Sequence, residues 1–123
     1  METLLFVYGT LKRGYSNHAH LAGQTYVGPA RTVPGFTLYD LGGYPGIVAD
    51  PADRVGVGGE VWRVDSAALA ALDQFEGVHE GLYRREPLRL APPYDAEQVE
   101  AYVSALPVLG RPHVGADWIE PRR

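Results

Sequence analysis

The chain contains no cysteine, and this absence excludes several kinds of chemistry. Without a thiol there is no disulfide, no zinc–thiolate centre and no cysteine nucleophile. The 123 residues must therefore be stabilised by their own core, and a chain of this length buries about two thirds of its unfolded surface. The hydrophobic fraction of 46% and the charged fraction of 21% are ordinary for a globular protein. We expect a single domain over residues 1–123 that folds without a metal or a disulfide.

Long hydrophobic runs and clusters of positive charge are also missing. The apolar stretch at residues 4–8 is too short for the core of a signal peptide and for a membrane span. The net charge is −4, and the 11 Lys and Arg residues are scattered rather than gathered in one stripe, which argues against a nucleic-acid partner. We therefore expect a cytoplasmic protein, a monomer or a weak homodimer, that binds neither nucleic acid nor a membrane.

Glycine and proline, in contrast, are plentiful. The 15 glycines and 10 prolines predict many turns and short elements. A helix is expected over residues 67–75, with a cap at residues 65–66 and Gly77 at its end. A helical turn is expected from Ser16 or Asn17 to Leu21. Strands are expected at residues 3–8, 25–27, 36–39, 46–48, 59–64, 83–90 and 99–104. This pattern predicts an α+β fold, a curled sheet or barrel of short strands with one dominant helix, and an unassigned tail at residues 106–123.

The segment FVYGTLKRGYSNH, residues 6–18, changes abruptly from an expected strand to a loop. Gly9 and Gly14 have the spacing of a phosphate-binding loop, but the Lys-Ser or Lys-Thr pair that such a loop needs is missing. The dinucleotide fingerprint fails as well. A glycine after a buried strand still allows positive φ or a close approach to bare N–H groups, which bind carboxylates as well as phosphates. The alternative is a tight turn without a ligand.

One carboxylate, Glu76, falls on the apolar face of the expected helix. At 100° per residue it lies about 20° from Leu69 and about 40° from Leu72 on the helical wheel. Burial and the helix dipole should both raise its pKa, which suits a general acid or base. In the alternative, the helix frays and Glu76 turns to solvent or pairs with Arg84 or Arg85.

Other candidate groups carry weaker signals. The four histidines lack the spacing of a metal site, and the sequence contains no Gly-x-Ser-x-Gly motif, so neither a metal nor a hydrolase triad is expected. Tyr83 and Tyr102 lie on expected strands after the helix and are candidates to point their hydroxyl groups into a pocket. Asp73 lies off the apolar stripe, and we expect it to be solvated.

Several motifs, in their order and spacing, resemble the γ-glutamylcyclotransferase superfamily, the AIG2-like domain. They are Tyr-Gly-Thr-Leu at residues 8–11, Lys-Arg-Gly at 12–14 with Asn17, Gly-Glu-Val-Trp at 59–62, Leu-Asp-Gln-Phe-Glu-Gly at 72–77 and Tyr-Arg-Arg at 83–85. The resemblance covers about residues 4–105. The loop motif looks most like the γ-glutamylamine branch, which cleaves γ-glutamyl-ε-lysine.

The resemblance implies a small β-barrel with flanking helices, a loop that holds the γ-glutamyl moiety, and a glutamate that acts as acid and base. By position, the loop is Tyr8, Gly9, Thr10 and Leu11, and the glutamate is Glu76. The implied substrate is a small γ-glutamyl amide, whose α-amine attacks the side-chain amide carbonyl to form 5-oxoproline and release an amine, without a metal or cofactor. An alternative from another class is a binding module of the same fold that holds a carboxylated metabolite.

Overall fold

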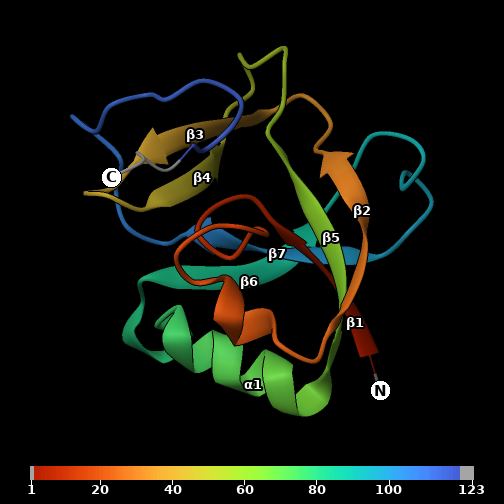
Figure 1. Cartoon of the computed structure of the whole chain (residues 1–123). Coiled ribbons are helices and arrows are strands. Elements are labelled where there is room, and N and C mark those ends of the chain that lie inside the picture. The colour runs from red at the N-terminus through yellow and green to blue at the C-terminus, as the bar shows by residue number, and fades with distance from the viewer. Residues whose placement is uncertain (1, 120–123) are drawn as a thin grey trace.

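The computed structural model describes residues 2–119, in which short strands form two sheets beside one main helix (Figure 1). The strands are β1 (Glu2–Val7), β2 (Thr25–Arg31), β3 (Phe36–Asp40), β4 (Pro45–Ala49), β5 (Gly58–Asp65), β6 (Tyr83–Leu88) and β7 (Val99–Ser104). The helices are α1 (Ser66–Phe75) and the short 3-10 helices η1 (His18–Leu21) and η2 (Val78–Glu80). The predicted α+β class and the dominant helix are confirmed.

The larger sheet is mixed, with the strand order β2-β5-β1-β7-β6, and β3 and β4 form a separate hairpin. The central strand β1 pairs antiparallel with β5 and parallel with β7. The outer strands β2 and β6 share no strand ladder among the described residues. Directly beyond them, Thr32 and Leu90 form an isolated antiparallel bridge, and the N–H of Ala91 donates to the carbonyl of Arg31 at 2.8 Å. The sheet is therefore not closed by a full strand ladder, and its edges meet only at this bridge. The β3–β4 hairpin and α1 lie on opposite sides of it (Figure 1).

The two faces of the larger sheet bury separate hydrophobic clusters, because successive side chains of a strand point to opposite faces. Phe6 of β1 lies in the cluster that includes Ile47 of the hairpin. Its neighbour Val7 lies in the cluster that includes Leu72 of α1. A strand covered on both faces needs an apolar side chain at nearly every position. This explains the continuous apolar run at residues 4–8.

Both ends of α1 follow from local sequence signals. The Asp65 carboxylate accepts a hydrogen bond from the N–H of Ala68 at 2.8 Å, which is the usual N-cap arrangement. At the other end, Gly77 adopts a left-handed φ of 70°. The N–H of Glu76 donates to the carbonyl of Leu72 at 2.8 Å, so the last turn is formed up to Glu76. The helix does not fray before this residue.

The segment after β7 packs back onto the fold, although its sequence has no period. Trp118 is buried with 5% of its surface exposed, and Lys12 Nζ donates to its carbonyl oxygen at 2.8 Å. The N–H of Val114 donates to the carbonyl of Leu38 in β3 at 3.1 Å. Residues 120–123 of the unassigned tail lie outside the described residues. Within residues 2–119, no helix combines the length and the hydrophobicity that a membrane crossing requires.

Candidate active site

A cavity of about 290 Å³ opens where β1 and β7 end and β6 begins. Its wall contains every residue that the sequence indicates for the site: Tyr8, Gly9, Thr10, Leu11, Glu76, Tyr83 and Tyr102. These residues come from the loop after β1, the end of α1, β6 and β7. The fold therefore brings together segments that are far apart in the sequence. A concave site of this size suits a small molecule.

Glu76 follows the last residue of α1 and reaches into this cavity from the helix end. Among the described residues that line the cavity, no other side chain carries a charge. Burial raises the pKa of Glu76 from 4.5 to about 7, because removal from water disfavours the charged carboxylate. Near neutral pH the group therefore exists in both protonation states, as an acid–base catalyst requires.

The two arginines considered as partners of Glu76, Arg84 and Arg85, are both paired with other carboxylates. Arg84 Nε lies 3.3 Å from Glu86 Oε2. Arg85 holds Asp73 with two parallel hydrogen bonds, from Nε at 2.8 Å and from Nη2 at 3.0 Å. Within the described part of the chain, Glu76 has no ion pair. The alternative in which an arginine neutralises this carboxylate is therefore not observed.

The prediction that Asp73 is solvated is wrong. Its side chain is 19% exposed, and besides the two bonds from Arg85 it accepts one from the hydroxyl of Tyr102 at 2.7 Å. Partial burial acts to raise the pKa of Asp73, but the hydrogen bonds from Arg85 and Tyr102 outweigh it and lower the pKa below its ordinary value. The helical wheel locates only the face of α1 that contacts the core, and Asp73 faces polar partners on β6 and β7 instead.

Four tyrosines line the cavity, and three of them, Tyr8, Tyr83 and Tyr102, each donate the hydroxyl hydrogen to a protein acceptor. Tyr8 donates to the backbone carbonyl of Tyr102 at 2.6 Å. Tyr83 donates to the carbonyl of Pro45, and Tyr102 donates to Asp73. Burial raises the pKa of all three hydroxyl groups, so they stay neutral at physiological pH. Their rings form fixed, uncharged parts of the wall.

The backbone approaches closely at Gly9, and the group that it approaches is Pro45 at the start of β4. A Cβ at position 9 would lie 2.4 Å from Pro45 Cγ. The φ of Gly9 is not positive, so glycine is required by the lack of space. Because Pro45 also lines the cavity and accepts the hydroxyl of Tyr83, this contact helps to shape the wall.

The turn after Gly9 lines the cavity and contains N–H groups that are not used within the described part of the protein. The N–H groups of Gly9, Thr10 and Leu11 have no acceptor among the described residues. The N–H of Lys12 closes the turn on the carbonyl of Gly9 at 3.1 Å, and the Asn17 amide donates to Thr10 Oγ1 at 2.9 Å. Successive N–H groups in a turn can bind a carboxylate or a carbonyl oxygen. The expected capping role of the Asn17 side chain is not observed, because its amide bonds to Thr10.

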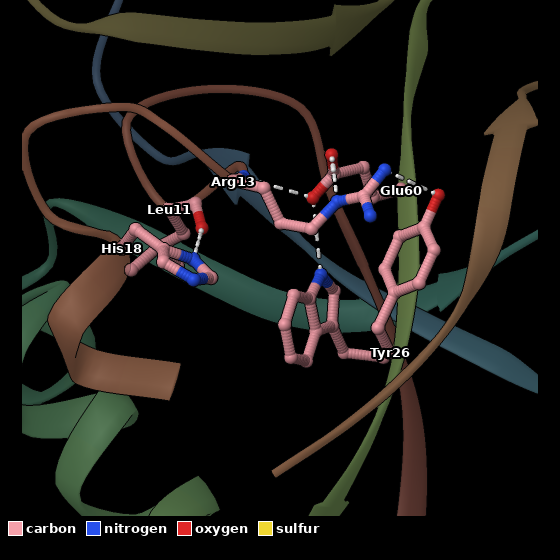
Figure 2. A network of polar contacts seen from close by, with 6 residues as sticks. Leu11, Arg13, His18, Tyr26 and Glu60 are labelled. Atoms are coloured by element: carbon pink, nitrogen blue, oxygen red, sulfur yellow. Dashed lines mark hydrogen bonds and ion pairs between the residues drawn. The ribbon is translucent and has the colours of Figure 1, made fainter. Parts of the chain in front are cut away.

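A second polar network, around Glu60 of β5, anchors the same loop away from the cavity (Figure 2). Glu60 Oε1 accepts the backbone N–H of Arg13 and the indole N–H of Trp62, both at 3.1 Å. The Arg13 side chain pairs with Glu60 at 3.4 Å, lies 3.6 Å from the centre of the Tyr26 ring and donates to the Tyr26 hydroxyl at 2.9 Å. Arg13 of the Lys-Arg-Gly motif therefore holds the loop and is not part of the cavity wall.

Sequence reasoning missed the rim of the cavity, which we define as Tyr44, Phe75, Leu82 and Leu106. These large apolar side chains line the cavity and remain 45%, 41%, 39% and 41% exposed, respectively. Each comes from a different segment, so no local period marks them as a group. Within residues 2–119, no cluster of three or more His, Asp or Glu residues is arranged to bind a metal ion.

Comparison with known proteins identifies a family whose members resemble this chain in sequence. A family model described as gamma-glutamyl cyclotransferase, AIG2-like, matches residues 5–120. A Vibrio cholerae protein provisionally named a gamma-glutamylcyclotransferase is 46% identical over 88 residues, covering 72% of this chain and 73% of that protein. A gamma-glutamylaminecyclotransferase of Rattus norvegicus is 38% identical over 93 residues, covering 70% of this chain and 62% of that protein.

Solved structures show the same fold. An AIG2-like protein from Mus musculus superposes with a TM-score of 0.80 at 31% sequence identity. The match covers 94% of this chain and 87% of the mouse chain. The mixed sheet and its single main helix are therefore shared with a solved member of the AIG2-like group.

Proposed function

The chain belongs to the gamma-glutamyl cyclotransferase, AIG2-like family, and we propose that it converts a γ-glutamyl amide into 5-oxoproline and a free amine. The observation that carries this proposal is Glu76, a partly buried carboxylate with a pKa of about 7 and no other charged group among the described residues of its cavity wall. Such a group can accept a proton from one nitrogen of the substrate and return it to another.

The reaction is a ring closure within the substrate. Glu76 takes a proton from the α-ammonium group, and the freed amine attacks the carbonyl carbon of the side-chain amide. The new C–N bond closes a five-membered lactam. Glu76 then delivers its proton to the nitrogen of the leaving amine, and the original amide C–N bond breaks. The ring nitrogen gives up a second proton, which the released amine takes up to leave as an ammonium ion, so the lactam keeps one N–H. The step needs neither water nor an external reductant, and a wall that folds the substrate into its cyclising conformer contributes a high effective molarity.

The turn at residues 9–11 supplies the polar contacts to the glutamyl part. Its N–H groups have no acceptor among the described residues, and they are suited to the α-carboxylate or to the oxygen of the carbonyl under attack. The rings of Tyr8, Tyr83 and Tyr102 form further parts of the wall. No step requires a metal ion or an organic cofactor.

The leaving amine carries an apolar chain rather than a second carboxylate. The rim offers four large apolar side chains to that part of the substrate. The cavity wall contains no Lys, Arg or His among the described residues, so a carboxylate on the leaving group would find no positive side chain there. The rat relative, which is named for γ-glutamylamines, agrees with this substrate class.

The test is the release of 5-oxoproline from a panel of substrates. The panel contains γ-glutamyl-n-butylamide, γ-glutamyl-ε-lysine, a γ-glutamyl α-amino acid and glutathione, each incubated with the wild-type protein and with Glu76→Gln. We expect the highest kcat/KM for the butylamide and a kcat that is about 10²–10⁴-fold lower in the variant. Binding of the panel without 5-oxoproline release would overturn the proposed activity in favour of a binding module. A preference for glutathione would overturn only the proposed leaving group.

A further inference from the structure

We propose that Asp73 is a positioning residue for this cyclisation, which fixes the side chain of Tyr102 against the cavity and holds the Arg85 guanidinium away from Glu76. The proposal rests on the proposed function, because the reaction defines what is positioned. It concerns a residue outside the cavity wall, since Asp73 does not line the cavity.

The first part of the proposal follows from a chain of contacts that ends in the wall. The Asp73 carboxylate accepts the Tyr102 hydroxyl at 2.7 Å. The backbone carbonyl of Tyr102 in turn accepts the Tyr8 hydroxyl at 2.6 Å. Both tyrosines line the cavity. Asp73 therefore determines where the Tyr102 ring lies. Through Tyr102 of β7 it also supports Tyr8, the first residue of the substrate loop.

The second part concerns the place of Arg85. Arg85 lies two residues after Tyr83 on β6 and directly opposite Tyr102 on β7, so all three side chains share one face of the sheet. Asp73 and Glu76 are three residues apart at the end of α1, and such residues are neighbours on a helix surface. The residue that Arg85 binds is therefore about one helical turn from Glu76 along α1.

The Arg85 guanidinium is bound by two carboxylates, those of Asp73 and Glu100. Its Nε and Nη2 donate to Asp73 at 2.8 and 3.0 Å, and its Nη1 contacts Glu100 of β7. A planar guanidinium bound at both oxygens of one carboxylate has a fixed orientation. If Asp73 loses its charge, Arg85 keeps only Glu100 and becomes free to turn towards Glu76. A cation there would favour the ionised form of Glu76.

The other titratable groups around Glu76 are tyrosines, histidines and carboxylates. The hydroxyl groups of Tyr8, Tyr83 and Tyr102 face it and are neutral. The 3-10 helices that pack against α1 contribute His18 and His20 from η1, with His20 stacked on Phe75, and His79 and Glu80 from η2. The charged residues of β1 and β5 beside the helix lie near its opposite end: Glu2, Arg63 and Asp65.

The experiment compares the pH dependence of kcat/KM for the wild type, Asp73→Asn and the double variant Asp73→Asn/Arg85→Gln. We expect Asp73→Asn to move the acid limb about 1 pH unit lower, because a nearby cation lowers the pKa of a carboxyl group by about 1–3. The double variant should restore the wild-type limb while kcat stays reduced. An unchanged limb in Asp73→Asn, or a limb that stays shifted in the double variant, would overturn the role of Asp73 in holding Arg85.

Two single variants separate positioning from charge. Tyr102→Phe keeps both charges and loses only the hydrogen bond to Asp73, so kcat should fall about tenfold with an unmoved pH limb. Glu100→Gln is the matched control, because it removes a carboxylate from Arg85 without touching the cavity wall, and its kcat and pH limb should match the wild type. Wild-type kcat in Tyr102→Phe would overturn the positioning of that ring.

A measurement without substrate keeps the inference separate from the proposed activity. The pKa of Glu76 can be followed by carbon NMR of the side-chain carboxyl in the wild type and in Arg85→Gln, which leaves Asp73 without its cation. We expect the pKa of Glu76 to be higher in this variant, opposite in sign to the change in Asp73→Asn. Equal values in all three proteins would contradict the inference even if the wild type proved catalytically active. Absence of 5-oxoproline release with the expected pKa changes would contradict only the reaction.

Discussion

Two glutamates that are largely shielded from solvent are associated with the loop at residues 8–17. Glu60 bonds to the loop, and Glu76 lines the cavity with it, and the two differ in their hydrogen-bond partners. Glu60, 9% exposed, receives hydrogen bonds from the backbone of Arg13 and the indole of Trp62 and an ion pair from the Arg13 side chain. Glu76 has no such partner among the described residues, and burial raises its pKa to about 7. Hydrogen-bond donors therefore surround Glu60, which lies outside the cavity wall, and the described residues provide none to Glu76, which lines the cavity.

The difference shows that burial alone does not make a carboxylate suited to catalysis. A carboxylate that accepts several hydrogen bonds from a loop serves as an anchor for that loop. A carboxylate that is desolvated without donors changes protonation near neutral pH and is free to exchange a proton with a ligand. By this reasoning Glu60 holds the loop in place, and we propose that Glu76 acts on what the loop binds.

The largest expected effect is the loss of turnover in Glu76→Gln. The amide keeps the shape of the protonated acid but cannot transfer a proton, so we expect kcat to fall by about 10²–10⁴-fold. The melting temperature and the binding of a γ-glutamyl ligand should be preserved. The measurement is 5-oxoproline release beside a thermal melt. Near wild-type turnover in a folded variant would remove the functional distinction between the two glutamates.

The same isosteric change at Glu60 should have the opposite profile. Glu60→Gln replaces one acceptor oxygen with an N–H₂ group and removes the ion pair to Arg13. The N–H groups of Arg13 and Trp62 then compete for a single oxygen. A buried donor left without an acceptor costs about 1–3 kcal/mol in the free energy of unfolding. Denaturant unfolding of both Gln variants gives the comparison directly. If Glu60→Gln were as stable as Glu76→Gln, the anchoring role of the Glu60 network would be wrong.

Gly9→Ala tests the wall between the loop and the hairpin. The new Cβ would lie 2.4 Å from Pro45 Cγ, and overpacking of this kind costs about 1–3 kcal/mol. We expect a lower melting temperature together with a higher KM, because the displaced loop carries the N–H donors of the site. Gly14→Ala serves as a control for loop glycines, because a Cβ there meets no atom within 4 Å and only the positive φ of 82° is strained. An unchanged KM in Gly9→Ala would show that the contact does not shape the site.

The smallest expected effect is a pH dependence of stability that belongs to Glu76 alone. Because burial raises the pKa of Glu76 from 4.5 to about 7, the folded state favours the protonated acid. Its contribution is fully present below pH 4.5 and is lost as the pH rises through about 7. The free energy of unfolding of the wild type, measured relative to that of Glu76→Gln, should therefore decrease as the pH rises from 4.5 to about 7. A flat difference would show that Glu76 is not desolvated in solution.

Local patterns in the sequence were sufficient to locate the helix and its unusual carboxylate. The cap at Asp65, the apolar period through Leu69 and Leu72 and the glycine at position 77 define α1 within about one turn, and Glu76 follows from that period. The apolar run of β1 and the glycine after it likewise indicated where the loop begins. These features depend on residues that are close in the sequence.

Contacts between distant segments could not be read in the same way. The approach of Gly9 to Pro45 and the partners of Asp73 depend on how the hairpin, β6 and β7 are placed around β1. The helical wheel placed Asp73 in solvent because it describes one helix without its neighbours. Trp118 reaches the core through an irregular segment that has no period to detect.

The most direct test of the account is the pH profile of kcat/KM for 5-oxoproline release from γ-glutamyl-n-butylamide by the wild-type protein. If Glu76 is the group that exchanges the proton, the acid limb should have its midpoint near its pKa of about 7. A midpoint near 4.5, the ordinary value of a glutamate, would mean that the ionisation that controls the reaction is not that of a desolvated Glu76. That result would contradict the central claim.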